Sequence, residues 1–249
     1  MQIAVCLKRV PDTATKVRVG ADGKSIDPTD VQYVISPYDE FAIEEAIRLK
    51  EKHDGTTVTV VTVGDAAAQK DLRQALAMGA DAGILIKSDE SVDPYQTSKN
   101  LAKALGDRGF DLVFFGRQSV DDGSGQVGPL TARLLGIPCV TDVVAFEVDG
   151  GRATIDREVE GAVEVIDAPL PVAITAQKGL NDPRYASLKG IMQAKKKKIE
   201  ELDLSGFDAR LDVQSLSPPP ARPDGKIVGE GVEAIPELVR LLREEAKVL

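Results

Sequence analysis

The chain contains few of the side chains from which hydrolytic and metal sites are built. Its 249 residues include one histidine, two cysteines and no tryptophan. His53 follows a charged stretch at the expected C-terminus of a helix, a place that suits a cation, so we interpret it as structural. Cys6 and Cys139 lie in separate apolar, strand-like stretches, where buried free thiols are favoured over a disulfide or a shared metal. Zinc sites and nucleophile–base triads therefore lack the residues they need.

Long apolar runs and an excess of basic residues are also missing. No run of about 18 apolar residues occurs, so no transmembrane segment is predicted. Residues 1–6 lead directly into an apolar stretch, without a basic leader, and we expect a cytoplasmic protein. The formal net charge of −9 argues against nucleic acid as a partner, because phosphate binding needs a basic face.

The first half of the chain alternates short apolar stretches with amphipathic ones. Strand-like stretches occur at residues 2–7, 57–63, 84–86 and 112–115. Between them, apolar residues recur at helical spacing at residues 42–47, 72–76 and 101–105. This alternation predicts an α/β fold, Rossmann-like, in which helices cover both faces of a doubly wound, mostly parallel sheet.

The pattern changes after Cys139. Residues 143–148 and 153–159 flank an Asp-Gly-Gly turn and predict a β-hairpin extension. A further strand is expected at residues 169–174. We divide the chain into an α/β domain, residues 1–200, and a C-terminal arm.

The arm, residues 201–249, includes a proline-rich linker at 215–229. A last helix follows, with Ile235, Leu238, Leu241 and Leu242 on one side. A tethered helix must bury such a stripe, either on its own domain or on a partner subunit.

Three segments are expected at the carboxyl ends of the strands, where open parallel sheets bind ligands. Residues 8–12 follow the first strand. Residues 36–39 carry a helix-start signature, with Ser36 as N-cap and Pro37 at the first helical position. Capping alone explains Ser36, but the free N–H groups of such a helix end also suit an anion.

The third segment, residues 116–129, is rich in glycine and opens into a helix. Glycine lets the backbone approach a phosphate, and the helix N-terminus stabilises negative charge. Gly123, Gly125 and Gly128 match the dinucleotide fingerprint in form, yet seven residues separate the strand from the first of them. We therefore expect a nucleotide, but not NAD. A turn without a ligand is the alternative.

Two other chemistries are not supported in this segment. Asp121 and Asp122 could contact a metal, but adjacent acids diverge and no third oxygen ligand follows, so turn and cap roles are favoured. No lysine follows the glycines in the manner of a phosphate-binding loop, which argues against phosphoryl transfer from ATP.

A surface loop is predicted at residues 180–198. It begins with Asn-Asp-Pro, carries Leu188 where no core periodicity demands an apolar residue, and ends in four lysines, 195–198, on an otherwise acidic chain. An apolar anchor surrounded by charge suits a protein interface. Leu188 as a packed loop residue and the lysines as a solvated face are the alternatives.

These stretches resemble the β subunits of electron transfer flavoproteins. The likeness covers nearly the whole chain and is carried by residues 5–12, 42–50, 75–81, 116–129 and 180–198. It implies an electron carrier rather than an enzyme. Such a subunit pairs with an α subunit that holds most of the redox-active FAD, and itself holds a structural AMP. The helix arm would dock on that α subunit.

The resemblance also implies roles for individual residues. The residues expected around AMP are Cys6, Ser36, Pro37, Tyr38, Asp39, Val63, Gly116, Arg117, Gln118, Ser119, Val120, Asp121, Asp122, Gly123, Ser124, Gly125, Gln126 and Val127. Dehydrogenase partners would meet Pro183, Arg184, Tyr185, Leu188, Ile191 and Met192, with Leu188 as the anchor. Glu164 would orient the flavin domain, although as sequence it is one carboxylate in a strand. The chain departs from some relatives at Thr13, where they place a tyrosine near the flavin, whereas Tyr38 keeps an aromatic ring at the other such position.

The implied function is to accept electrons from acyl-CoA or other flavin dehydrogenases and to pass them to a membrane quinone oxidoreductase. Two alternatives stay open. A bifurcating relative would hold a second FAD in place of AMP. A stand-alone domain that senses adenine nucleotides would share the glycine-rich segment but would have no use for the 180–198 loop or the arm.

Overall fold

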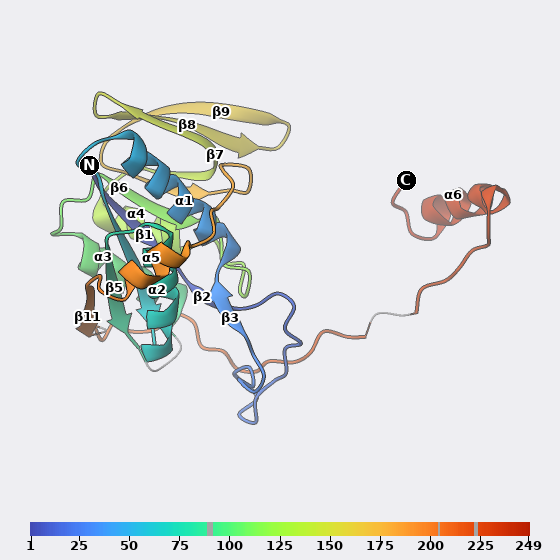
Figure 1. Cartoon of the computed structure of the whole chain (residues 1–249). Coiled ribbons are helices and arrows are strands. Elements are labelled where there is room, and N and C mark those ends of the chain that lie inside the picture. Colours follow the sequence, from blue (N-terminus) through green and yellow to red (C-terminus); the bar gives the residue numbers. More distant parts are fainter. Residues whose placement is uncertain (89–91, 204, 222–223) are drawn as a thin grey trace.

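The chain folds around a nine-stranded sheet (Figure 1). The computed structural model describes residues 1–88, 92–203, 205–221 and 224–249. Across the sheet the strands follow the order β11-β5-β4-β1-β6-β10-β7-β8-β9. Their bounds are β1 (Gln2–Cys6), β4 (Thr57–Gly64), β5 (Ala82–Lys87), β6 (Leu112–Gly116), β7 (Cys139–Asp149), β8 (Arg152–Val159), β9 (Ala162–Pro169), β10 (Val172–Ala176) and β11 (Ile199–Asp203).

The sheet is parallel from β11 to β7 and antiparallel beyond. The predicted hairpin is β7–β8, and its turn uses Gly150 and Gly151 at φ of 55° and 79°. Successive positive φ angles suit the turn that matches strand twist, and glycine adopts them without strain. In Figure 1 the β7–β9 extension projects from one end of the body.

Helices cover both faces of the parallel part, which confirms the doubly wound fold. The helices are α1 (Pro37–Lys52), η1 (Ala66–Ala68), α2 (Gln69–Met78), α3 (Pro94–Leu105), α4 (Val127–Leu135), α5 (Leu188–Ala194), η2 (Val232–Ala234) and α6 (Ile235–Glu244). Strand side chains alternate between the faces: Val5 packs in a cluster with α1 and α2, and Cys6 in a second cluster with α3 and α4.

Three features lay outside the sequence-based expectation. The 180–198 segment is not a loop throughout, because α5 forms within it, with the Ser187 hydroxyl accepting a hydrogen bond from Gly190 N. The charged stretch after the lysines forms β11, which pairs with β5 and crosses residue 200, the predicted domain boundary. β2 (Arg9–Pro11) and β3 (Tyr33–Ile35) form a small separate sheet.

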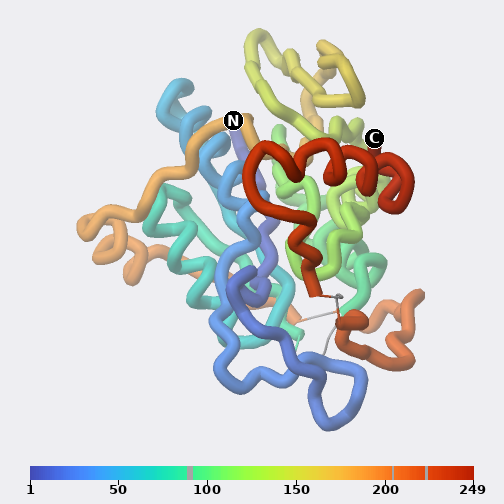
Figure 2. The backbone as a smooth tube through the Cα atoms, turned by 90° about the vertical axis from the view of Figure 1, so that its right-hand side faces the viewer, coloured from blue at the N-terminus to red at the C-terminus, as the bar shows by residue number. Residues whose placement is uncertain are grey.

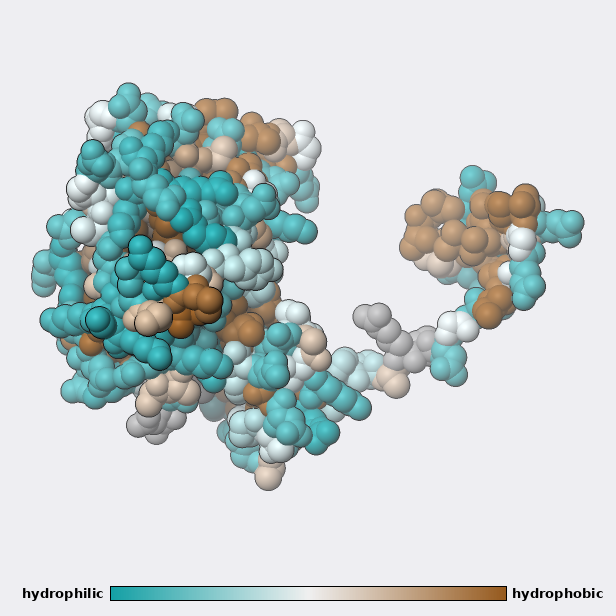
Figure 3. Space-filling view, viewed as in Figure 1, coloured by the Kyte–Doolittle hydropathy of each residue, from teal (hydrophilic) through white to brown (hydrophobic). Residues whose placement is uncertain are grey.

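The first part of the arm stays on the body: Phe207 O accepts a hydrogen bond from the Gln96 side chain of α3, and Leu216 N donates to Gly23 O. Figure 1 shows α6 apart from the sheet, and in Figure 2, turned by 90°, the same helix lies in front of the body. Brown, hydrophobic atoms gather on α6 in Figure 3. Ile235 and Leu238 of α6 are exposed, as is Val232 of the preceding η2. Among the residues that the structure describes, no helix has the length and apolar character of a membrane span.

Both cysteines lie in strands, as predicted, and both are free thiols. Cys6 is buried at the end of β1, whereas Cys139, which begins β7, is only half-buried. The expectation of full burial was therefore wrong for Cys139, because this first residue of β7 packs only partly against the cluster formed with α3 and α4.

Candidate functional site

A cavity of about 870 Å³ opens at the carboxyl edge of the sheet. It lies where β1, β4 and β6 end and where α3 and α4 begin. The chain leaves β1 toward β4 on one side and later returns to β6 on the other, so strand order reverses at β1. Open parallel sheets bind their ligands at such a reversal. The cavity therefore occupies the place expected for a ligand.

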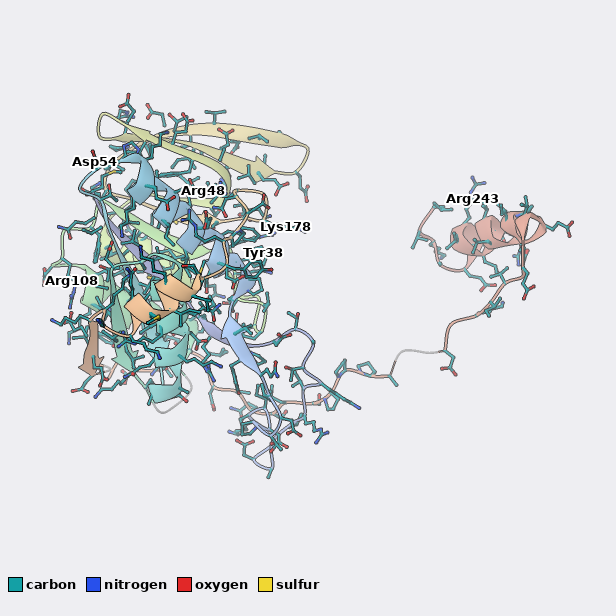
Figure 4. The ribbon with its side chains drawn as sticks, in the orientation of Figure 1. Tyr38, Arg48, Asp54, Arg108, Lys178 and Arg243 are labelled. Atoms are coloured by element: carbon teal, nitrogen blue, oxygen red, sulfur yellow. The ribbon has the colours of Figure 1, made fainter. Side chains whose placement is uncertain are left out.

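Most of the residues expected around a nucleotide meet at this cavity. Those that line it are Cys6, Asp39, Val63, Gly116, Arg117, Gln118, Ser119, Asp121, Asp122, Ser124, Gly125, Gln126 and Val127. Five expected residues are not part of its lining: Ser36, Pro37, Tyr38, Val120 and Gly123. Tyr38 lies in the first turn of α1 and is half-buried (Figure 4).

Asp39 joins the ends of two strands. One carboxylate oxygen accepts a hydrogen bond from Lys8 N at 2.7 Å and the other from Gly116 N at 2.9 Å. Burial raises the pKa of Asp39 to about 7, outweighing these two hydrogen bonds, which favour the ionised form. A Cβ at Gly116 would lie 2.7 Å from Asp39 N, so the two chain segments meet too closely for any other residue.

Ser36 occupies the N-cap position of α1, but the predicted side-chain cap is not formed. Its carbonyl oxygen accepts from the N–H groups of Asp39 and Glu40. The hydroxyl is buried and has no hydrogen-bond partner among the described residues. The sequence signature therefore located the helix start correctly and misassigned the serine side chain, because the backbone after β3 turns it into the interior.

The glycine loop, residues 116–126, is tied to the end of β1 by Lys8. The Lys8 ammonium lies 2.9 Å from both Asp121 and Asp122 and donates to the Ser119 hydroxyl at 3.2 Å. Burial alone would lower the pKa of Lys8, but the two carboxylates raise it.

Asp122 has the predicted turn role within that loop. Its carboxylate accepts hydrogen bonds from Ser124 N and the Ser119 hydroxyl. Burial raises the pKa of Asp122, but these two donors and the Lys8 ammonium lower it by more. The pKa of Asp122 is therefore held at about 2. In the part of the chain that the structure describes, no three His, Cys, Asp or Glu side chains are grouped to hold a metal ion.

The arginines of the cavity wall are matched by acids of the same chain. Arg9 pairs with the buried Asp71 at 2.9 Å and stacks on the Tyr33 ring. Arg117 pairs with Asp142 at 2.7 Å. Because Lys8 is also paired, a phosphate here would be held mainly by backbone N–H groups.

The start of α4 offers such groups. The side chain of its N-cap residue, Gln126, makes no capping hydrogen bond, so the first N–H groups of the helix are not used by it. A Cβ at Gly128 would lie 2.8 Å from the Thr175 methyl group on β10, so glycine allows α4 to begin close against the sheet. This geometry fits the phosphate of a nucleotide.

One further wall of the cavity was not predicted from the sequence. A strap formed by residues 205–213 lies against α3 and contributes Ala209, Leu211, Asp212 and Val213 to the cavity. Asp93, the N-cap of α3, accepts hydrogen bonds from Arg210 N and Leu211 N. The Asp-Pro-x-Gln signature at 93–96 predicts a helix start, but no local signal reveals that a distant strap completes the cap.

Cys6 contributes packing to the cavity rather than reactivity. Burial, with a smaller contribution from Asp39, raises the pKa of its thiol far above the usual range. The thiolate is the reactive form of cysteine. The apolar side of the cavity, which includes Val63 and Phe115, therefore suits a flat base rather than a covalent step.

A second candidate surface is the docking segment, residues 183–192. Its apolar side chains stand in solvent: Tyr185 is 98% exposed, Leu188 84% and Met192 71%. Hydrophobic atoms gather near α5 in Figure 3. Arg184, one of the residues expected to meet a partner, pairs with Glu44 and Glu51 of α1.

The lysines that follow differ from one another. Lys195, Lys196 and Lys198 are exposed. Lys197 turns inward, and its ammonium donates to the carbonyl oxygens of Leu76 and Ala80 at the end of α2. The lysine run is therefore not a uniformly solvated face.

Glu164 is exposed on the edge strand β9. Its carboxylate lies 3.5 Å from the Arg157 guanidinium on β8. The residue is thus displayed on the antiparallel extension, away from the cavity.

Comparison with known proteins confirms the resemblance seen in the sequence. A profile of the family described as electron transfer flavoprotein domain matches residues 24–206. The electron transfer flavoprotein subunit beta of Bacillus subtilis is 47% identical over 262 residues, covering 100% of both chains. The subunits of the same name from Bradyrhizobium diazoefficiens and Homo sapiens are 40% and 38% identical, covering 100% of this chain. The similarity to these relatives, which are named as beta subunits, extends over the full length of the chain. The chain therefore belongs to the electron transfer flavoprotein family.

Proposed function

We propose that this chain is the β subunit of a heterodimeric electron carrier and that the cavity holds a structural AMP. One observation carries the proposal: the glycine loop, the start of α4 without a side-chain cap, and the apolar wall meet at one cavity. The backbone would bind the phosphate and the wall would hold the adenine. Membership of the family supports the electron-carrier role.

A bound FAD would accept and release the electrons, and in this proposal the α subunit holds most of it. This chain contributes docking and orientation. Its exposed Glu164 would orient the flavin domain, and α6 would bury its apolar stripe on the α subunit. The exposure of that stripe, at Ile235 and Leu238, supports a partner for the arm.

The docking segment would receive acyl-CoA or other flavin dehydrogenases. Leu188 and Met192 form an exposed apolar pair on α5, and exposed lysines lie close by in the chain. An apolar anchor with a charged surround suits a transient interface with acidic proteins. A membrane quinone oxidoreductase would then receive the electrons.

The nucleotide content of the purified complex tests the proposal. The chain is co-expressed with its α partner, the complex is denatured by heat, and the released nucleotides are identified by mass. One FAD and one AMP per heterodimer are expected. A complex that forms without AMP or a second flavin would contradict the cavity assignment.

A second candidate is a subunit of a bifurcating carrier, with FAD in place of AMP. The cavity volume of about 870 Å³ supports this second candidate, because the volume lies near the upper end of ordinary ligand pockets and leaves room for a dinucleotide. Two FAD and no AMP in the same measurement would select it. A stand-alone adenine-nucleotide sensor would instead form no complex with an α partner, which gel filtration detects.

A further inference from the structure

Arg184 differs from the other members of the docking segment. The neighbouring Tyr185 projects into solvent, whereas the Arg184 guanidinium turns back onto α1. Its Nε lies 2.8 Å from Glu44 Oε2, and a terminal nitrogen lies 3.0 Å from Glu44 Oε1. Two further hydrogen bonds join it to Glu51.

Glu44 is an unusual partner because its side chain is only 3% exposed. Besides the guanidinium, it accepts the backbone N–H of Arg184 at 3.2 Å and the Nε of Arg48 at 2.9 Å. Arg48 lies on the same helix (Figure 4). Burial raises the pKa of Glu44, but these donors outweigh it and leave the pKa below its usual range. Removing Arg184 would leave a buried carboxylate with less than its full set of partners.

The start of the segment is gripped at a second point. Asn181 is buried, and its amide donates to the Phe41 carbonyl and to Glu45 Oε2, both on α1. At the other end, α5 packs on α2, where a Cβ at Gly190 would collide with the Ala77 carbonyl. The exposed anchor is therefore held between two fixed ends.

A guanidinium engaged in this way is a poor contact for a partner. To meet an acid on another protein it would have to leave two carboxylates, one of them buried. Fixing the segment before association, by contrast, lowers the conformational entropy lost on binding. Exposed cations, such as Lys189 and Lys195, need give up no buried partner to contact an acidic surface.

We propose that Arg184 is a positioning residue, which presents Leu188 to the partner through its clamp with Glu44 and Glu51 and is not itself a contact with the partner. The clamp is a property of this chain alone. Its consequence for docking rests on the proposed function.

Hydrogen exchange tests the clamp without any partner. Amide exchange of the full chain is measured for Arg184→Ala, Arg184→Lys and Glu44→Gln, with Arg152→Ala as the matched control. Arg152 forms an exposed ion pair with Asp167 on β8–β9, far from the segment in the fold. Exchange at residues 181–192 should accelerate by about tenfold or more in the first three variants and stay unchanged in the control.

The lysine variant is the sharpest of these, because lysine keeps the charge but lacks the forked donors of arginine. Protection equal to wild type in Arg184→Lys and Arg184→Ala would overturn the clamp. Should Glu44→Gln fail to fold, Glu51→Gln replaces it, since Glu51 is on the surface, and a smaller acceleration at the same residues is expected.

Docking is then measured as electron uptake from a purified acyl-CoA dehydrogenase and its acyl-CoA substrate, using the chain with its α subunit. Both Arg184 variants should raise KM about fivefold, leave kcat nearly unchanged and keep the salt dependence of wild type. Lys189→Ala should instead weaken the salt dependence.

Full rescue by Arg184→Lys, or a reduced salt dependence in Arg184→Ala, would make Arg184 a direct contact. If Leu188→Ala leaves uptake unchanged, the docking proposal fails, while the exchange data still decide the clamp.

Discussion

At the scale of single residues, Asp39 shows how one carboxyl group shapes the cavity. It joins the backbone after β1 to the start of the glycine loop, and the strand reversal lies between them. The group is buried, and each of its carboxylate oxygens accepts a backbone N–H. Its role is to set the distance between two segments that would contact a nucleotide.

The pH dependence of stability should reveal Asp39. Its pKa of about 7 in the folded chain exceeds the ordinary value of 3.8 for an aspartate, so its stabilising contribution is complete below about pH 4 and is lost as pH rises through 7. The free energy of unfolding of wild type relative to Asp39→Asn should therefore fall by about 3 kcal/mol between pH 4 and 7.5. Urea unfolding at both pH values measures it.

Asp107→Asn, at an exposed site on the opposite edge of the sheet, is the control for that measurement. It removes one carboxyl group far from Asp39, so it reports the effect of an Asp-to-Asn substitution in general. Parallel pH curves for wild type and Asp39→Asn would show that Asp39 titrates as an ordinary carboxyl group.

Glycine is needed at position 116 because two backbone segments lie very close together there, and not because of its φ angle. In Gly116→Ala the new methyl group would press on the Asp39 and Tyr38 backbone, and we expect about 1–3 kcal/mol lower unfolding free energy and loss of bound nucleotide. Gly123→Ala is the matched control: its Cβ enters open space, although φ is +62°, so only about 1 kcal/mol should be lost. Equal nucleotide content in both alanine variants would argue against the close approach at Gly116.

At the scale of elements, α5 carries the exposed anchor. Leu188→Ala should raise KM for a dehydrogenase roughly tenfold or more, because a buried leucine in an interface contributes about 2 kcal/mol. Flavin and nucleotide content should not change. Leu134→Ala, on the exposed side of α4, supplies a control of equal chemistry elsewhere. Electron uptake by Leu188→Ala with the wild-type KM would show that Leu188 is not the anchor.

The arm is the second element with a separable role. Leu216 N bonds to Gly23 O, and beyond it the chain extends away from the body (Figure 1). Truncation after Ser217 should leave the unfolding free energy of the isolated chain nearly unchanged, because few contacts tie α6 to the sheet. Size-exclusion chromatography after co-expression should show no stable complex with the α subunit. A normal heterodimer would place the interface elsewhere.

At the scale of the whole molecule, charge is unevenly used. The chain carries a net charge of −9, yet exposed lysines follow the docking segment. Association with an acidic dehydrogenase should weaken as salt screens this local attraction, with KM rising about fivefold between roughly 0.03 and 0.3 M salt. A salt-independent KM would leave apolar contact as the only attraction.

Local patterns in the sequence determined much of the architecture. Apolar stretches that alternate with amphipathic ones predicted the doubly wound sheet, and the Asp-Gly-Gly turn predicted the β7–β8 hairpin. The glycine loop was found because glycine and a helix start are encoded within a few residues. Each of these signals is short in range, so periodicity and turn chemistry are sufficient to detect it.

Tertiary structure alone decided how the charged side chains are used. The sequence places Lys197 and Arg184 in a surface segment. In the fold, Lys197 donates to a carbonyl oxygen at the end of α2, and Arg184 donates to a carboxylate on α1. Asp39 lies within the helix-start signature at residues 36–39, and in the fold its carboxylate joins the ends of β1 and β6. Partners such as these lie far apart along the chain, and no local pattern specifies them. What a charge contacts is set by which elements the fold brings together, and burial then decides how strongly it is held.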